Sequence, residues 1–223
     1  MIRLITLDMA GTTIHDEGSV HKAFLDAMAA HDHPVSHDDA NEAMGFKKTE
    51  AIRMMLDSVH GITDADDALV EAIHDTFMQK MIDFYRTDPS VRPIDGVEDL
   101  FRTLRDRGVH IALETGFYRP IADVIIDRLG WRDLIHTSTT SDEVEHARPA
   151  ADLIRANMAK TGVQDVTEVL KAGDTPADLR SGEAAGTRFN VGVCTGGYTR
   201  EQLAAEPHTH ILDSLVEITD LID

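Results

Sequence analysis

Residues 2–13 read Ile-Arg-Leu-Ile-Thr-Leu-Asp-Met-Ala-Gly-Thr-Thr, a short apolar run that ends in a carboxylate and a glycine-containing turn. An apolar run of this length, rich in β-branched residues and bounded by turn residues, is typical of a buried strand. Similar runs recur at 109–113, 134–137, 169–172 and 188–193. Stretches with helical periodicity separate them, at 97–107, 119–129, 150–160 and 176–185. Alternating strands and helices indicate parallel βαβ units with right-handed crossovers. The sequence therefore predicts an α/β fold with a doubly wound, Rossmann-like parallel sheet.

The first and second predicted strands are about a hundred residues apart, far more than one crossover requires. This stretch has helical patterns at 20–30, 38–44, 47–60 and 64–85 and no convincing strand alternation. We therefore expect residues 16–89 to form a separate helical lid. The lid is inserted into a core domain made of residues 1–15 and 90–223.

The composition limits the classes of partner. A net charge of −19 argues against nucleic acid and anionic membranes, because binding to them needs clustered Lys and Arg. No window approaches the roughly 18 consecutive apolar residues of a membrane helix. Cys194 is the only cysteine, so no internal disulfide can form, which fits a reducing cytoplasm. An acidic protein that binds an anionic substrate needs local positive charge, which makes a bound cation plausible.

Polar residues gather at the carboxyl ends of the predicted strands, where doubly wound sheets place their active sites. These residues are Asp8, Thr115, Thr139, Thr140 and Asp174. A carboxylate such as that of Asp8 can attack phosphorus and form an aspartyl-phosphate, provided that a divalent cation offsets the repulsion. Pro176 suits a first helical position, which puts Asp174 in the loop and Asp178 about one turn further on. Hard oxygen ligands of this kind favour Mg²⁺.

Two further elements can hold a phosphoryl group. Thr115-Gly116 follows the second predicted strand and offers a hydroxyl and an approachable backbone N–H. Arg148 follows the third predicted strand and, with Pro149, opens the next helix, where its cation can offset charge. The four elements in this order predict a Mg²⁺-dependent hydrolase that acts at phosphorus, with a small phosphorylated or phosphonate substrate.

In this order, the elements resemble the motifs of the haloacid dehalogenase superfamily over essentially the whole chain. The long insert before Thr115 matches the helical cap domain that this superfamily places between its first two motifs. The resemblance implies that Asp8 is the nucleophile and that Asp178 orients metal-bound water. It further implies the following assignments. The carboxylates of Asp8 and Asp174 and the carbonyl of Ala10 contact Mg²⁺, and the phosphoryl group is bound by Thr12, Thr115, Gly116 and Arg148.

Ala10 departs from the common pattern of these phosphatases, which have a general acid two residues after the nucleophile. An alkoxide leaving group normally takes its proton from that acid, and alanine cannot provide it. Asp-x-Ala-Gly-Thr-Thr instead resembles the phosphonatase branch, in which a C–P bond is broken with the help of an imine between the substrate aldehyde and a cap lysine. The resemblance implies a small phosphonate such as phosphonoacetaldehyde as substrate, and a homodimer joined through the caps. Met54, Met55 and Phe77 could support that dimer or a monomer's core.

The candidate lysine is Lys48, which the branch's Met-Gly-x-x-Lys spacing selects from residues 44–48. Lys48 would share a helical face with Ala51, Ile52 and Met55, and a lysine on an apolar face can be desolvated, as imine formation requires. It could also bind a substrate anion or only extend its amine to solvent. The branch's histidine three residues after the lysine is absent, because that position is Ala51.

Three alternatives remain open at this point. The chain could be a phosphatase for a small phosphomonoester whose leaving group needs little protonation. It could be a haloacid dehalogenase in which Asp8 attacks carbon, but Asp174 and Asp178 would then have no use. It could be a phospho-acceptor module, for which the lid and Arg148 are superfluous.

Overall fold

The structure is a computed structural model of the 223-residue chain, and it describes residues 1–15, 18–43 and 48–222. The chain divides into two compact units, which we describe separately. One consists of residues 1–16 and 89–223 and the other of residues 17–88. The predicted motif at 44–47 lies outside the described residues.

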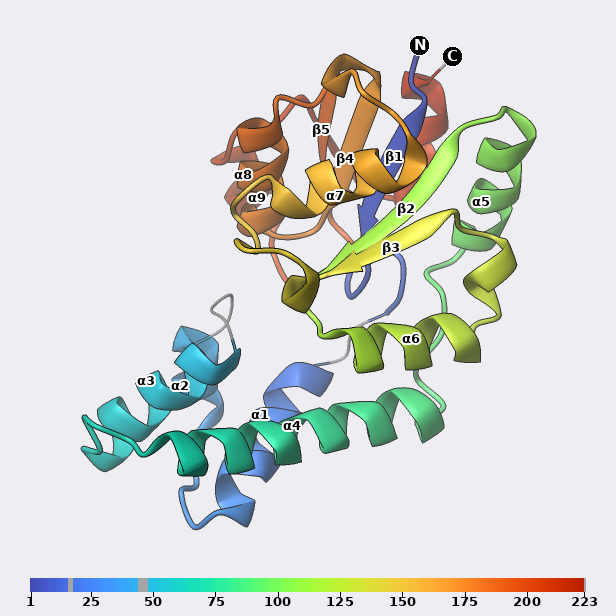
Figure 1. Ribbon diagram of the computed structural model, residues 1–223. Coiled ribbons are helices and arrows are strands. Elements are labelled where there is room, and N and C mark those ends of the chain that lie inside the picture. Colours follow the sequence, from blue (N-terminus) through green and yellow to red (C-terminus); the bar gives the residue numbers. More distant parts are fainter. Residues whose placement is uncertain (16–17, 44–47, 223) are drawn as a thin grey trace. The chain divides into compact units, whose positions relative to one another are not determined.

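The larger unit is built on one six-stranded parallel sheet in the order β3-β2-β1-β4-β5-β6 (Figure 1). The strands are β1 (Leu4–Asp8), β2 (His110–Thr115), β3 (Thr137–Thr140), β4 (Val169–Gly173), β5 (Phe189–Val193) and β6 (His210–Leu212). This order is that of a doubly wound sheet, so the predicted fold class is confirmed. The order reverses between β1 and β4, and polar residues that follow these two strands meet at the point where such folds bind ligands.

Helices cover both faces of the sheet (Figure 1). They are α5 (Val97–Asp106), α6 (Arg119–Arg128), α7 (Asp152–Thr161) and α8 (Pro176–Ala185), with the short α9 (Arg200–Ala204) near the C-terminus. Side chains of successive strand residues point to opposite faces. On one face, residues of β1, β2 and β4 join α7 in a buried apolar cluster of Leu4, Ala112, Ile154, Val163 and Val169. Burial of this kind, at about 25 cal/mol per Å² of apolar surface, holds the helices on the sheet.

Two of the predicted boundaries that differ from the structure bear on the site. The third strand was expected at 134–137 but runs over Thr137–Thr140. The apolar residues before it form a turn instead, because the carbonyl of Trp131 accepts hydrogen bonds from the amides of Leu134 and Ile135. Helix α7 begins at Asp152, so Arg148 lies in the segment before the helix and does not open it. Arg148 and Pro149 lie instead in a turn, in which the carbonyl of Ala147 accepts a hydrogen bond from the amide of Ala150.

The smaller unit is helical, with α1 (Ser19–Ala30), α2 (His37–Glu42), α3 (Lys48–His60) and α4 (Asp67–Thr87). Helices α1 and α4 pack through Phe24 and Phe77, whose stacked rings have centroids 4.5 Å apart. The long α4 starts where the Asp66 side chain accepts a hydrogen bond from the amide of Ala68, an N-cap that fixes its first turn. Buried apolar faces on α1, α3 and α4 give this unit a core of its own.

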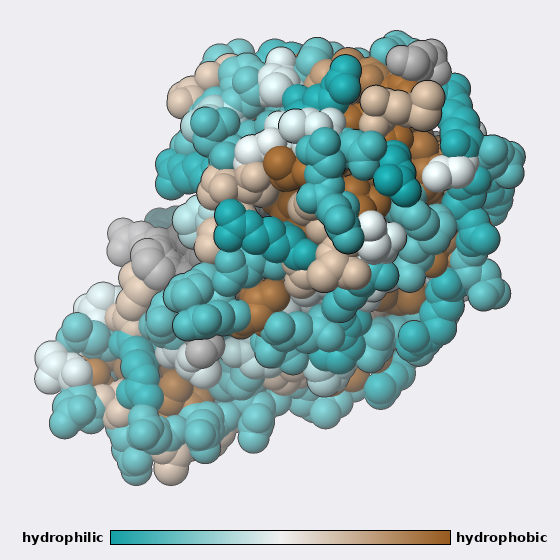
Figure 2. Space-filling view, turned by 45° about the horizontal axis from the view of Figure 1, so that its top comes forward, coloured by the Kyte–Doolittle hydropathy of each residue, from teal (hydrophilic) through white to brown (hydrophobic). Residues whose placement is uncertain are grey.

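Hydrophilic side chains cover most of the face seen in Figure 2, with smaller hydrophobic areas between them. Many of the exposed charges form ion pairs, such as Lys22 with Asp26 and Arg180 with Glu206. Within the described residues, no helix combines the length and the apolar character that crossing a membrane requires.

Candidate active site

Asp8 is the last residue of β1 and is 4% exposed. The chain turns directly after it, because the carbonyl of Met9 accepts hydrogen bonds from the amides of Thr12, Thr13 and Ile14. Gly11 makes this turn possible, since its φ of +88° is strained for any residue with a side chain. The strand and its turn therefore fix the Asp8 carboxylate at the carboxyl edge of the sheet.

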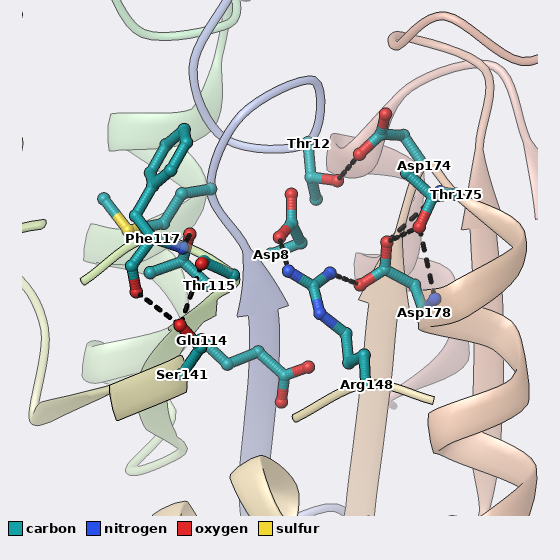
Figure 3. A network of polar contacts seen from close by, with 12 residues as sticks. Asp8, Thr12, Glu114, Thr115, Phe117, Ser141, Arg148, Asp174, Thr175 and Asp178 are labelled. Atoms are coloured by element: carbon teal, nitrogen blue, oxygen red, sulfur yellow. Dashed lines mark hydrogen bonds and ion pairs between the residues drawn. The ribbon is translucent and has the colours of Figure 1, made fainter. Parts of the chain in front are cut away.

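Three buried carboxylates meet at this edge. Oxygen atoms of Asp8, Asp174 and Asp178 all lie within 4.8 Å of one another. Asp174 follows β4, and Asp178 lies in the first turn of α8, where it forms a capping box with Thr175. The predicted loop and helix thus bring together the acidic residues that the sequence singled out (Figure 3).

Arg148 joins two of these carboxylates. Its guanidinium lies between Asp8 and Asp178 (Figure 3), with Nη2 2.8 Å from Oδ1 of Asp8 and Nη1 hydrogen-bonded to Oδ1 of Asp178. The side chain is only 12% exposed, so the ion pairs are shielded from water. Burial disfavours its charge, but Asp178 and Asp8 outweigh that effect and raise the pKa of Arg148. Arg148 is therefore a permanent cation beside the candidate nucleophile.

The three carboxylates differ in how well their charge is compensated. Burial raises the pKa of Asp8 to about 6, although Arg148 acts against it. Burial and the charge of Asp8 raise the pKa of Asp174 well above its ordinary value. For Asp178, Arg148 and Lys171 outweigh burial and hold the pKa well below its ordinary value. Asp178 is therefore well compensated by its two cations, Asp8 only in part by Arg148, and Asp174 least of the three.

A divalent cation fits this arrangement. Asp174 accepts a hydrogen bond from the Thr12 hydroxyl at 2.9 Å, and no ion pair to a cationic side chain is found for it among the described residues. Carboxylate oxygens are hard ligands that suit a divalent ion such as Mg²⁺, and Arg148 alone does not offset the charges of both Asp8 and Asp174. Asp8 and Asp174 would hold the ion directly, with the turn at Ala10 beside them. Asp178 is already engaged by Arg148 and Lys171 and suits an outer position.

Thr115 and Gly116 lie at the end of β2, next to this cluster. Thr115 is 2% exposed, and its Oγ1 accepts a hydrogen bond from the amide of Phe117 at 3.1 Å. A Cβ placed on Gly116 would be 3.7 Å from Nη2 of Arg148, so this backbone adjoins the arginine. The predicted phosphoryl-binding residues of the larger unit are thus brought together around Asp8.

Two charged residues of the site were missed in the sequence. Lys171 in β4 and Glu114 in β2 are both fully buried, with Nζ and Oε1 2.9 Å apart. Lys171 also donates a hydrogen bond to Oδ1 of Asp178 at 2.7 Å. A usable signal was present, because each residue interrupts an otherwise apolar strand, and a charge is almost never fully buried unless it is paired.

Lys48 belongs to the smaller unit and is the first residue of α3. Its Nζ lies 5.5 Å from the ring centroid of Phe24, a distance at which a cation and an aromatic face attract. Ala51, Ile52 and Met55 are buried, so the predicted apolar face of this helix is present. Its role in the reaction stays a prediction.

The loop after β5 packs against the site. The Thr195 hydroxyl donates a hydrogen bond to the carbonyl of Gly11 at 2.6 Å. A Cβ on Gly196 would lie 1.8 Å from Oδ2 of Asp174, whereas a Cβ on Gly197 would meet nothing within 4 Å. Only glycine at position 196 leaves room for the Asp174 carboxylate.

The two glycines give a matched pair of variants. We expect Gly196→Ala to push Asp174 aside, to destabilise the protein by about 1–3 kcal/mol and to weaken Mg²⁺ binding, because overpacking at a rigid contact cannot relax freely. Gly197→Ala serves as the control and should change both quantities little. Thermal unfolding and calorimetric titration with Mg²⁺ measure the two effects. Equal behaviour of the two variants would contradict the close contact.

The raised pKa values predict how Mg²⁺ stabilises the protein at different pH. The pKa of Asp8 rises from 3.8 to about 6 on folding, so its contribution to stability is present at low pH and is lost as pH rises through about 6. Protons and the cation compete for Asp8 and Asp174. The increase in melting temperature on adding Mg²⁺ should therefore be small at pH 5 and large at pH 8. An increment that is larger at pH 5 would contradict this picture.

Comparisons with known proteins agree with the motifs. A family model described as haloacid dehalogenase-like hydrolase matches residues 2–186. The phosphonoacetaldehyde hydrolase of Hahella chejuensis is 30% identical over 210 residues, which cover 88% of this chain and 69% of that protein. The protein of the same name from Nitratidesulfovibrio vulgaris is 30% identical over 215 residues, covering 88% of this chain and 72% of that protein. The predicted family is therefore confirmed.

Solved structures extend the likeness to the fold. A phosphonoacetaldehyde hydrolase-like protein from Oleispira antarctica has a TM-score of 0.81 at 20% identity, covering 99% of this chain and 91% of that one. A predicted phosphoglycolate phosphatase from Haemophilus somnus has a TM-score of 0.84 at 16% identity, covering 100% and 98%. At these identities the likeness concerns the fold alone. Taken with the family model, it places the chain among the haloacid dehalogenase-like hydrolases, and this protein is an enzyme of that family.

Proposed function

We propose that this enzyme is a Mg²⁺-dependent, phosphonatase-like hydrolase that cleaves the C–P bond of a small phosphonate such as phosphonoacetaldehyde. One observation carries the proposal. The Asp8 carboxylate sits at the strand end with Arg148 2.8 Å away and uncompensated Asp174 opposite, while the position two residues further holds Ala10. These features support attack of Asp8 on phosphorus in a reaction that does not use the usual general acid.

In the proposed reaction, an oxygen of Asp8 attacks the phosphorus atom and the C–P bond breaks, which leaves an aspartyl-phosphate. Arg148 and the Thr115–Gly116 backbone would bind the phosphoryl oxygens and offset their charge as the bond forms. A bound Mg²⁺ supplies the positive charge that lets one anion approach another. Water then hydrolyses the aspartyl-phosphate and releases inorganic phosphate.

The leaving group is the reason to invoke Lys48. When the C–P bond breaks, carbon keeps the electron pair of the bond, and this is possible only if that pair is delocalised. A general acid at position 10 would not meet this requirement. An imine between the Lys48 amine and the substrate aldehyde, formed with loss of water, would take up the pair as an enamine. Lys48 is partly buried, and its Nζ lies 5.5 Å from the ring centroid of Phe24 within the helical unit.

Lys48→Ala tests this role, with Lys47→Ala as the matched control one residue away. We expect Lys48→Ala to abolish phosphate release from phosphonoacetaldehyde while Lys47→Ala retains it. Borohydride added during turnover should attach the substrate to the Lys48 peptide alone, as mass spectrometry would show. Normal phosphonate turnover by Lys48→Ala would remove the imine from the mechanism.

A second candidate is a phosphatase for a small phosphomonoester. Ala51 favours it, because the assisting histidine of the phosphonatases is replaced there by a fully buried alanine. A panel of phosphomonoesters, assayed beside phosphonoacetaldehyde, separates the two. Turnover of esters only, unaffected by Lys48→Ala, would make the enzyme a phosphatase.

Two less favoured functions would give different experimental results. Dehalogenation of a haloacid that persists in EDTA would favour attack of Asp8 on carbon. An aspartyl-phosphate that forms but never turns over would favour a phospho-acceptor module. The buried cluster of Asp8, Asp174 and Asp178 argues against the first, because a metal-free displacement has no use for it. The helical unit and Arg148 argue against the second, because a phospho-acceptor module needs neither.

The cellular location, the partners and the oligomeric state of the enzyme also stay proposals. We propose a cytoplasmic enzyme without nucleic-acid or membrane partners, which its net charge of −19 supports. We further propose a homodimer through the helical unit. Met55 and Phe77 are buried within that unit, so Met54, which is 37% exposed, is the residue left to contribute. Sedimentation of wild type and Met54→Glu would test the dimer.

A further inference from the structure

A fully buried ion pair lies beneath the three carboxylates. Neither Lys171 nor Glu114 is accessible to solvent, and their charged atoms are 2.9 Å apart. Removing two charges from water costs several kcal/mol per ion, and such a pair is weak as a source of stability. Perturbed buried charges cluster at functional sites. A buried pair that adds little stability and lies next to the carboxylate cluster is therefore a candidate for a function in that site.

Every contact of the Lys171 ammonium is fixed. Its Nζ donates hydrogen bonds to the carbonyl of Ala172 at 3.0 Å and to Oδ1 of Asp178 at 2.7 Å, and its third neighbour is Oε1 of Glu114. Glu114 is held in turn by the Thr6 hydroxyl, 2.7 Å from its other oxygen. The ammonium therefore has one orientation, and that orientation points at Asp178.

Asp178 has two cationic partners on the same oxygen. Arg148 and Lys171 both donate to Oδ1, while Oδ2 accepts from the hydroxyl and amide of Thr175. The two cations differ in their other contacts. Arg148 also pairs with Asp8, whereas the other contacts of Lys171 that the described residues provide, Glu114 and the Ala172 carbonyl, are buried within the sheet.

This difference matters during the reaction. Under the proposed function, Arg148 turns to the phosphoryl group as Asp8 is converted into the aspartyl-phosphate. Asp178 then loses part of the charge that Arg148 supplies. Lys171 is the cation that stays bound to Asp178, and it keeps the Asp178 carboxylate ionised and in its orientation.

We propose that Lys171, oriented by Glu114, is a positioning residue that holds the Asp178 carboxylate in place while Arg148 serves the phosphoryl group. The inference rests on the proposed metal-dependent function and deepens it. It assigns the chain two cations with separate tasks, one for the substrate and one for the metal-site carboxylate.

The variants below distinguish a positioning role of Lys171 from an effect on folding stability and from an effect of net charge. Lys171→Met leaves Glu114 buried without a counter-ion and should lose both stability and activity. The double variant Glu114→Gln/Lys171→Met removes one charge of each sign, so the net charge of the site is unchanged and the unpaired carboxylate is gone. Ile154→Ala, in the apolar cluster under α7, is a control for lost stability alone.

We expect the double variant to recover most of the melting temperature that Lys171→Met loses. Its kcat should stay about 10–100-fold below wild type with KM nearly unchanged, and calorimetry without substrate should show Mg²⁺ binding about 10–100-fold weaker, as for other outer partners of metal ligands. Ile154→Ala should lose stability but keep kcat and Mg²⁺ affinity. A double variant with wild-type kcat and Mg²⁺ affinity would overturn the role of Lys171. Wild-type protein that binds no Mg²⁺ would instead overturn the proposed function, before any variant is compared.

Discussion

Asp8→Asn should lose catalytic turnover by about 10⁴-fold or more, because the amide cannot attack phosphorus and no covalent intermediate can form. The measurement is phosphate release from the best substrate in the presence of Mg²⁺. Folding should survive the change. The pKa of Asp8 is raised to about 6, which means that its charge is unfavourable in the metal-free fold.

The stability of the same variant is its control. Without metal at pH 8, Asp8→Asn should unfold at a temperature no lower than wild type, although it loses the contact with Arg148. A variant that is inactive because it is unfolded would fail this control. A folded variant with substantial activity would mean that another group is the nucleophile.

Ala10→Asp is expected to raise turnover of phosphomonoesters by about 10²–10⁴-fold, the contribution typical of a placed general acid. Ala10 is partly exposed in the turn that follows β1, so a longer side chain has room there. An aspartic acid at this position can protonate an alkoxide as it leaves. It offers nothing to a carbanion, so phosphonate turnover should not rise.

Ala10→Asn is the matched control, because asparagine has the same shape but cannot act as the acid. We expect this variant to gain no phosphomonoesterase activity. If both variants gain it equally, the effect is one of side-chain size, and the absence of an acid at position 10 does not explain the enzyme's substrate class.

The parts of the site that the sequence predicted are those with local signals. Asp8 and Asp174 each follow an apolar run and precede a turn or a helix start, so the strand, its end and the carboxylate can be identified within a dozen residues. Parallel strands then bring such ends to one edge of the sheet. Arg148 could be predicted as a cation near the site, although its helix begins only at Asp152.

The parts that could not be predicted depend on strand order and register. Lys171 and Glu114 lie on β4 and β2, which are not neighbours but flank β1 on its two sides. Their pairing follows only once β1 is known to be central, with Thr6 beside Lys171. The third strand was misplaced for a different, local reason, because Leu134 and Ile135 donate hydrogen bonds to the carbonyl of Trp131 and form a turn before the strand.

The central claim is that Asp8 becomes covalently phosphorylated during turnover. Rapid acid quench of the working enzyme, followed by peptide mass spectrometry, tests it most directly. We predict a phosphoryl adduct on the peptide that contains Asp8, which forms with Mg²⁺ and substrate, disappears as substrate is exhausted, and is absent in Asp8→Asn. Phosphate release by wild type without any adduct on that peptide, together with activity of Asp8→Asn, would contradict the account.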